Sequence, residues 1–129
     1  MENMGGEYMF WFIEVIKRAF DFSGRSRRKE YWMYTLFYFL FSAILTIVDM
    51  LLGWDITDDF GVLSGLFMLI LLIPSISVVF RRLHDTGRSA WWILISLIPL
   101  IGAIVLIVFF ALDSEPESNK FGPNPKTTL

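Results

Sequence analysis

The residue types best suited to catalysis or to binding a charged ligand lie in one short stretch, residues 81–89 (RRLHDTGRS). An imidazole next to a carboxylate suggests proton transfer, and His84 and Asp85 are such neighbours. Adjacent residues on a helix do not face each other, however, and the pair need not interact. No serine, cysteine or second carboxylate at motif spacing completes a nucleophilic or acid–base set. We therefore predict no catalytic residues and expect the protein not to be an enzyme.

The charges in this stretch also fit a helix end or a lipid contact. Arg81, Arg82 and His84 suit the C-terminal end of a helix, where cations are favoured, and an Asp-Thr-Gly turn would close it. Contact with anionic lipid accounts for them equally well, because a juxtamembrane basic residue contributes about 1 kcal/mol near a negative leaflet. The chain has no cysteine and one histidine, which excludes thiolate chemistry and multi-histidine or cysteine-based metal sites. We predict no metal and no cofactor.

Three apolar runs must position these charges: residues 31–52, 60–80 and 91–112. Each is 21 or 22 residues long, and none contains lysine, arginine or glutamate. A bilayer core needs about 20 helical residues to cross. The expected fold is all-α, a single polytopic membrane domain over residues 1–129 with three transmembrane helices. Residues 113–129 would form a polar tail.

A short amphipathic helix is expected ahead of the first span. In residues 8–20 (YMFWFIEVIKRAF) apolar side chains recur at spacings of three and four, which is typical of a helix lying in the membrane interface. Met9, Phe10 and Trp11 widen its apolar face, so burial against the spans is an equal alternative.

The positive-inside rule gives an orientation. With three spans, nine Lys and Arg residues lie on one side and only Lys120 and Lys126 on the other. The loop after the first span carries Asp55, Asp58 and Asp59 and no basic residue. We expect a multi-pass membrane protein with a cytoplasmic N-terminus and an external C-terminal tail.

Pro74 and Pro99 are predicted to kink two of the spans. Both lie roughly 11 Å from the cytoplasmic end at 1.5 Å per residue, and each frees a carbonyl one turn back, at Ile70 and Ile95. The kinks could open a shallow polar pocket beneath the arginine loop, or could simply pack against neighbouring helices. Gly102 is predicted to be a close-packing site.

One tripeptide occurs twice, as Gly24-Arg25-Ser26 and Gly87-Arg88-Ser89, each time ahead of an aromatic pair. A turn with a membrane-anchoring arginine accounts for both copies. A shared binding role for the two arginines is the alternative.

These segments resemble the bacterial inner-membrane family known as domain of unknown function 805. Residues 22–32 (FSGRSRRKEYW) and 81–92 (RRLHDTGRSAWW) are similar to its two signatures, and residues 119–125 are similar to its tail pattern. Ala90 stands where the family usually has glycine, and Arg27 where a small polar residue is common. The resemblance implies a small multi-pass protein of the bacterial inner membrane without an assigned reaction. The signature residues map onto Arg25, Arg28, Glu30, Trp32, Arg81, Arg82, His84, Asp85, Arg88 and Trp92.

We expect these ten residues to form a cytoplasmic belt that binds anionic lipid headgroups or a partner protein, with no role in nucleic-acid binding. Glu30 is expected to pair with one of the arginines at 81, 82 or 88. An oligomeric small transporter or channel subunit is the alternative function, with Asp49 as its only intramembrane acid. Gly61 and Gly65 form a small-xxx-small pair, which weakly favours a homo-oligomer.

Overall fold

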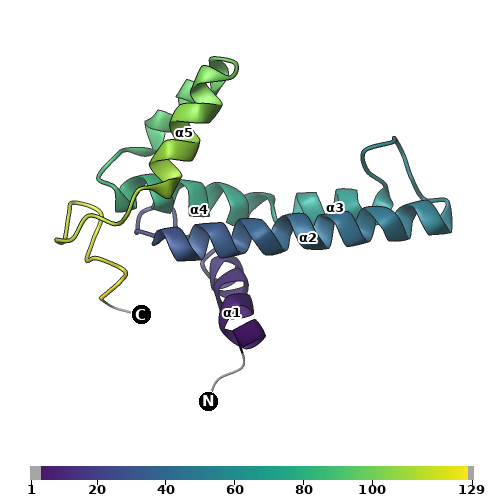
Figure 1. The fold of residues 1–129 in the computed structure, drawn as a ribbon, viewed down its shortest axis with the longest axis horizontal. Helices are drawn as coiled ribbons and strands as arrows, with labels where there is room; N and C mark the ends of the chain where they lie inside the picture. The colour runs from purple at the N-terminus through teal and green to yellow at the C-terminus, as the bar shows by residue number, and fades with distance from the viewer. Residues whose placement is uncertain (1–3, 128–129) are drawn as a thin grey trace.

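The computed structural model describes residues 4–127, and within that range the chain is helical, with two isolated β-bridges and no longer strand. The prediction of an all-α fold is confirmed. Figure 1 shows the helices in chain order. They are α1 (Met4–Lys17), α2 (Arg28–Leu52), α3 (Val62–Ile70), α4 (Leu72–Asp85), the 3-10 helix η1 (Ala90–Leu97) and α5 (Ile101–Ala111).

The long axis of the molecule is α2, with α3 and α4 returning alongside it (Figure 1). At 25 residues, α2 contains the predicted span 31–52 and is long and apolar enough to cross a membrane. The helices α3 and α4 meet at an angle of 45° around Leu71 and amount to a second crossing only if the bent pair counts as one span. The described residues therefore provide one clear membrane-spanning helix, or two with the bent pair.

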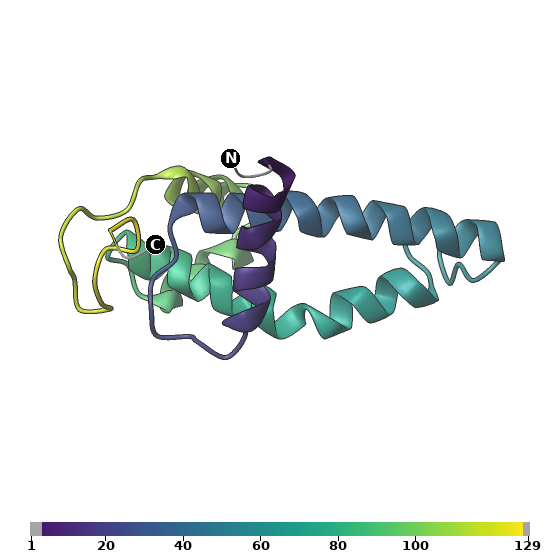
Figure 2. The same ribbon diagram turned by 90° about the horizontal axis from the view of Figure 1, so that it is seen from below.

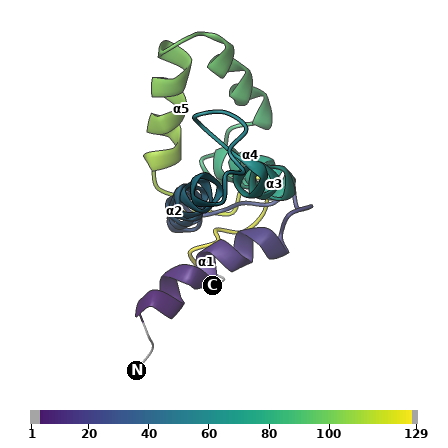
Figure 3. The ribbon, with the colours of Figure 1, turned by 90° about the vertical axis from the view of Figure 1, so that its right-hand side faces the viewer.

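The predicted third span, residues 91–112, is not a straight helix, and that prediction is wrong. Its two halves, η1 and α5, run side by side as a hairpin that rises from the α2–α4 layer (Figures 1 and 3). Leu100 has a positive φ of 66° at the turn between them, where the Ile101 N–H donates to the Pro99 carbonyl at 2.7 Å. An 11-residue α5 is too short to span about 30 Å of hydrocarbon at 1.5 Å per residue.

The hairpin has two local causes. Pro99 has no N–H to donate, so the Ile95 carbonyl accepts instead from the N–H of Ile98, at 3.0 Å. Gly102 then allows α5 to approach η1, since a Cβ at this position would overlap the Ile95 carbonyl oxygen. The predicted close-packing role of Gly102 is confirmed.

The N-terminal helix α1 lies across α2 on the side away from the hairpin (Figures 2 and 3). Trp11, Phe12 and Val15 are buried, and the Phe12 ring stacks on Tyr34 with centroids 5.4 Å apart. The predicted helix over residues 8–20 is thus present but begins and ends earlier. Burial against the neighbouring helix, the alternative left open by its sequence, accounts for these contacts.

Candidate functional site

Charged side chains from three distant parts of the chain meet at one end of the molecule. They come from the loop between α1 and α2 with the first turn of α2, from the C-terminal end of α4, and from the tail after α5 (Figures 1 and 2). Arg25, Arg81 and Arg82 are each at most 3% exposed there, as are the carboxylates Glu30 and Asp85. Removing so much charge from water is costly unless each group is paired and hydrogen-bonded.

Arg81 and Glu30 form the first ion pair of this network. Their side chains are fully buried, with Nη2 of Arg81 3.2 Å from Oε2 of Glu30. Ser26 bridges the two, because it donates to Glu30 at 2.9 Å and accepts from Nε of Arg81 at 2.7 Å. The Nη1 group of Arg81 donates to the carbonyls of Arg18 and Asp21, both at 2.8 Å. The expected Glu30–arginine pair is confirmed, and its partner is Arg81.

Arg25 connects the tail to the rest of the network. Its Nε donates to Oδ1 of Asp85 at 3.0 Å, and its Nη2 donates to the Asp85 and Glu115 carbonyls at 3.1 and 2.8 Å. Its Nη1 donates to the carbonyls of Glu117 and Gly122 at 3.0 and 3.1 Å. One carboxylate and four carbonyls thus surround a single guanidinium, which has five N–H donors.

Arg82 links α4 to the end of α5. Its Nη1 donates to Oδ2 of Asp85 at 2.5 Å, and its Nε to the Phe110 carbonyl at 2.9 Å. Its Nη2 also donates to the Leu112 carbonyl. The last carbonyls of a helix lack partners within the helix, so Arg82 satisfies groups that would otherwise be unpaired. Ser114 from the tail donates to the same Asp85 oxygen.

His84 is placed away from these acids. Its Nδ1 lies 3.0 Å from the Gly24 carbonyl and must donate, since a carbonyl only accepts. The ring stacks on Phe121 of the tail with centroids 3.9 Å apart and planes 6° from parallel. Asp85 instead faces Arg25 and Arg82. His84 and Asp85 therefore do not form a proton-transfer pair in this structure.

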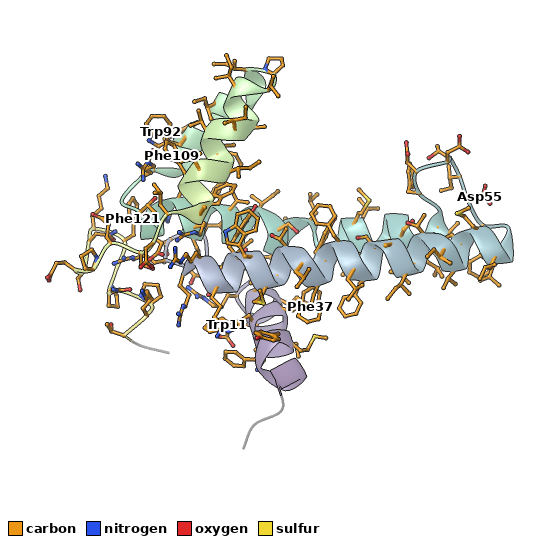
Figure 4. The ribbon with its side chains drawn as sticks, viewed as in Figure 1. Trp11, Phe37, Asp55, Trp92, Phe109 and Phe121 are labelled. Atoms are coloured by element: carbon orange, nitrogen blue, oxygen red, sulfur yellow. The ribbon has the colours of Figure 1, made fainter. Side chains whose placement is uncertain are left out.

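The remaining predicted belt residues lie at the surface, around the foot of the hairpin. The Arg28 side chain is 53% exposed and donates to the Ala111 carbonyl at 3.4 Å. The indole N–H of Trp32 donates to the Phe110 carbonyl at 3.1 Å. The guanidinium of Arg88 lies 4.0 Å from the Phe109 ring centroid, and Trp92 packs edge-on against the same ring (Figure 4). The two Gly-Arg-Ser tripeptides thus place their arginines differently, one buried and one at the surface.

Outside the membrane-spanning helices, two aspartates have shifted pKa values. Burial opposes ionisation of Asp21, but hydrogen bonds from Arg18 and from the backbone N–H of Gly24 outweigh it and lower the pKa of Asp21. A hydrogen bond from Lys126 lowers the pKa of Asp113. Both carboxylates are therefore ionised at neutral pH and hold cations at the edge of the network.

The buried network includes residues that sequence reasoning missed. Arg18, which lies 3.3 Å from Glu30, is not among the predicted site residues. Ser26 and Ser114 were not singled out as site residues. Contacts between residues far apart in the sequence cannot be predicted from local patterns, and Ser114 is 29 residues from its partner Asp85. The aromatic and asparagine of the tail pattern, Phe121 and Asn119, were the available signal, and both contact His84.

The tail after α5 packs against the polar end of the molecule. Residues 115–122 hydrogen-bond directly to the side chain of Arg25 and to the backbone of α4. The tail therefore lies at the same end of the molecule as the first loop and the C-terminal end of α4. Three straight spans would have placed the tail at the opposite end, whereas the η1–α5 hairpin returns the chain to the end from which it started.

No group of acidic, histidine or cysteine side chains suited to a metal ion occurs in the described part of the chain. Two cavities adjoin the polar end. One of about 350 Å³ lies between α1, the following loop and the tail, next to Arg18 and Phe121. The other, of about 210 Å³, lies between α2 and α4 beside Tyr34 and Ser75, one residue after the Pro74 kink. A pocket near one of the two prolines is therefore present.

Comparisons with known proteins agree on one family. The family model described as "Protein of unknown function (DUF805)" matches residues 19–123. The chain is 45% identical over 118 residues to "Inner membrane protein YhaH" of Escherichia coli (strain K12), covering 92% of this chain and 98% of that protein. It is 42% identical over the same length to "Inner membrane protein YhaI" of that strain, covering 92% and 97%. No solved structure matches.

Proposed function

The chain belongs to the DUF805 family of proteins of unknown function, and we propose that it is a non-enzymatic inner-membrane protein that binds anionic lipid headgroups at its polar end. The surface cations around the foot of the hairpin, Arg28 and Arg88, would make the contact. The buried arginines, Arg25, Arg81 and Arg82, would instead hold the helices together.

This division of the arginines is the observation that carries the proposal. Every guanidinium nitrogen of Arg25, Arg81 and Arg82 donates to an internal acceptor, so none is left for a headgroup. Arg28 faces its acid partner, Asp113, only at 3.9 Å, with both side chains about half exposed. Exposed Trp92 lies near Arg88, and indoles prefer the headgroup level of a bilayer.

The test is lipid retention by the purified full-length protein, measured by native mass spectrometry in phosphatidylglycerol or phosphatidylcholine. The wild type should retain phosphatidylglycerol preferentially, and R28Q/R88Q should lose that preference. Lys120→Gln is the matched control, because it removes a surface cation on the tail, away from the hairpin. If R28Q/R88Q retains phosphatidylglycerol as the wild type does, the proposed site is wrong.

We further propose that both ends of the described chain face the cytoplasm. All 11 lysines and arginines then lie on one side, within residues 17–29, 81–88 and 120–126, and none lies in residues 53–61. This asymmetry is stronger than the nine-to-two division that three spans would give, and short basic loops favour the cytoplasmic side. The bent α3–α4 pair would serve as the second crossing, and the η1–α5 hairpin would enter the bilayer without crossing it.

Single cysteines test this topology cleanly, because the chain contains none. A membrane-impermeant maleimide added to intact spheroplasts should label Asp58→Cys. It should label Ser23→Cys and Ser118→Cys only after lysis. All three positions are exposed and lie outside the helices. Labelling of Ser118→Cys in intact spheroplasts would contradict the proposed sidedness.

The transporter alternative has no specific support from the described contacts. Asp49 is fully buried and accepts hydrogen bonds from the N–H groups of Leu63 and Ser64 at 2.9 and 3.0 Å, and from the Ser64 hydroxyl at 3.0 Å. A carboxylate suits the N-terminus of α3, where backbone N–H groups lack partners. Gly61 packs on the same Asp49 side chain, because a Cβ in place of its hydrogen would lie only 2.5 Å from that side chain. Gly61 therefore faces α2 rather than a second copy of the chain.

A further inference from the structure

The groove between α2 and α4 is the cavity whose lining most closely matches a known class of ligand. It measures about 210 Å³, and its lining combines hydroxyls with apolar surface. The lining includes Tyr31, Tyr34, Thr35, Phe39 and Ser75. A wholly apolar groove would suit any hydrocarbon, whereas hydroxyls inside a membrane protein need polar partners.

One pair of hydroxyls lies at the inner wall of this groove. The Tyr34 and Ser75 oxygens are 2.6 Å apart and join α2 to α4 just after the Pro74 kink. The Tyr34 hydroxyl also lies 3.5 Å from the Leu71 carbonyl. When Tyr34 donates to Ser75, the Ser75 hydroxyl keeps its own proton for a further acceptor. Thr35, the next residue of α2, adds a further hydroxyl to the lining.

The groove is aligned with a surface cation on the same helix. Arg28, Tyr31 and Thr35 follow one another at spacings of three and four and so share a face of α2. Thr35 lies about 10 Å along the axis from Arg28, at 1.5 Å per residue. Phe39, four residues further, is 65% exposed at the groove. The order from one end is therefore cation, hydroxyls and exposed aromatic ring.

We propose that this face binds one anionic phospholipid molecule, and the inference rests on the proposed function. The phosphate would lie at Arg28, the ester carbonyls of the glycerol backbone would accept hydrogen bonds from the groove hydroxyls, and an acyl chain would continue past Phe39. Charge complementarity at Arg28 selects an anionic lipid, and the hydroxyls recognise the ester region that all diacyl phospholipids share. The lipid would thus be held at two depths rather than by its headgroup alone.

The experiment titrates the full-length protein in detergent with phosphatidylglycerol or phosphatidylcholine and follows binding by native mass spectrometry. Removing one hydrogen bond typically costs about 1 kcal/mol, so Thr35→Val should weaken phosphatidylglycerol binding by roughly fivefold. Ser75→Ala should have an effect of similar size. Thr46→Val is the matched control, because the Thr46 hydroxyl bonds the Ser42 carbonyl of its own helix, at 2.8 Å, outside the groove.

A photoreactive residue gives a second measurement that does not depend on affinity. Benzoylphenylalanine in place of Phe39 should cross-link to a phospholipid acyl chain in membranes, and Arg28→Gln should reduce the yield. Thermal unfolding of each variant controls for misfolding.

The outcomes separate the two proposals. Phosphatidylglycerol binding that depends on Arg28, Thr35 and Ser75 supports the groove. Binding that falls with R28Q/R88Q but is unaltered by Thr35→Val and Ser75→Ala overturns the groove and leaves the proposed function standing. Equal binding of both lipids by the wild type and every variant overturns both.

Discussion

The buried pair of Glu30 and Arg81 allows a quantitative test of what holds the polar end together. Glu30→Leu would leave Arg81 fully buried without its carboxylate at 3.2 Å. Breaking a buried ion pair from one side costs about 3–5 kcal/mol, because an uncompensated charge remains. Arg81→Met should lie at the upper end of this range, since it also removes the donor to the carbonyls of Arg18 and Asp21.

The double variant E30L/R81M should be markedly less destabilised than the sum of the two single variants. It leaves no unpaired buried charge from this pair, and two apolar side chains of similar volume replace the ions. Residues in contact usually show coupling energies of about 0.5–3 kcal/mol, and a fully buried pair should lie near the upper limit. The double variant therefore separates the cost of an orphaned charge from the net value of the pair.

Reversible unfolding in bicelles, followed by near-ultraviolet circular dichroism, measures these free energies. Lys126→Gln is the control, because it breaks a surface ion pair of 3.0 Å between side chains 39% and 47% exposed. Such a pair contributes at most about 1 kcal/mol. The reasoning is refuted if Glu30→Leu costs no more than Lys126→Gln, or if the single-variant costs simply add.

Single contacts elsewhere in the chain lead to three more predictions. Gly102→Ala should destabilise the hairpin by several kcal/mol, because the alanine Cβ would overlap the backbone oxygen of Ile95. The variant should be cleaved between η1 and α5 faster than the wild type in limited proteolysis. An unchanged rate of proteolysis would contradict the close packing. Asp49→Asn should cost about 1–3 kcal/mol in the same unfolding assay, because an amide nitrogen cannot accept the backbone N–H groups that the carboxylate accepts; a cost near zero would contradict the capping role. Because the pKa of Asp21 is lowered in the folded state, its ionisation adds stability above its unfolded pKa of 3.8, and this contribution is lost as pH falls through the folded pKa. Asp21→Asn should therefore reduce the loss of unfolding free energy with falling pH in that acid range. An unchanged dependence of the unfolding free energy on pH would exclude the pairing with Arg18.

The sequence predicted the membrane class, the helical content and most of the buried charged residues of the polar end. The apolar runs indicate a helical membrane protein, because hydrocarbon tolerates only backbone that is internally hydrogen-bonded. It did not predict the hairpin, although Pro99 and Gly102 were both recognised. Length alone suggested a span, since 22 apolar residues can form either one crossing helix or two short antiparallel ones. The choice between them depends on the positive φ at Leu100, which is uncommon for a residue other than glycine and is not indicated by a leucine in the sequence.

The roles within the polar end were equally hidden. Basic residues near a membrane indicate headgroup contact by composition, but Arg25 and Arg82 are buried by segments far away in sequence. Only the fold brings the Glu117 carbonyl to Arg25, across 92 residues. Local patterns therefore identified which residues matter without distinguishing structural arginines from surface ones.

The buried arginines explain how such a small bundle can hold together in lipid. Apolar packing gives little net drive between helices there, because lipid tails are as apolar as leucine. Much of α2 and α5 is accordingly exposed, and the described helices share only two small buried apolar clusters. At the polar end, in contrast, three arginines join α4 to the first loop, to the end of α5 and to the tail. Two buried carboxylates cannot balance three guanidiniums, so backbone carbonyls supply the remaining acceptors. Those carbonyls come largely from the end of α5 and from the tail, which lies mostly outside helices. The arginines thus supply hydrogen-bond donors to carbonyls that would otherwise be unpaired, and the carbonyls spread the positive charge of the arginines. Neither group would be stable when buried without the other.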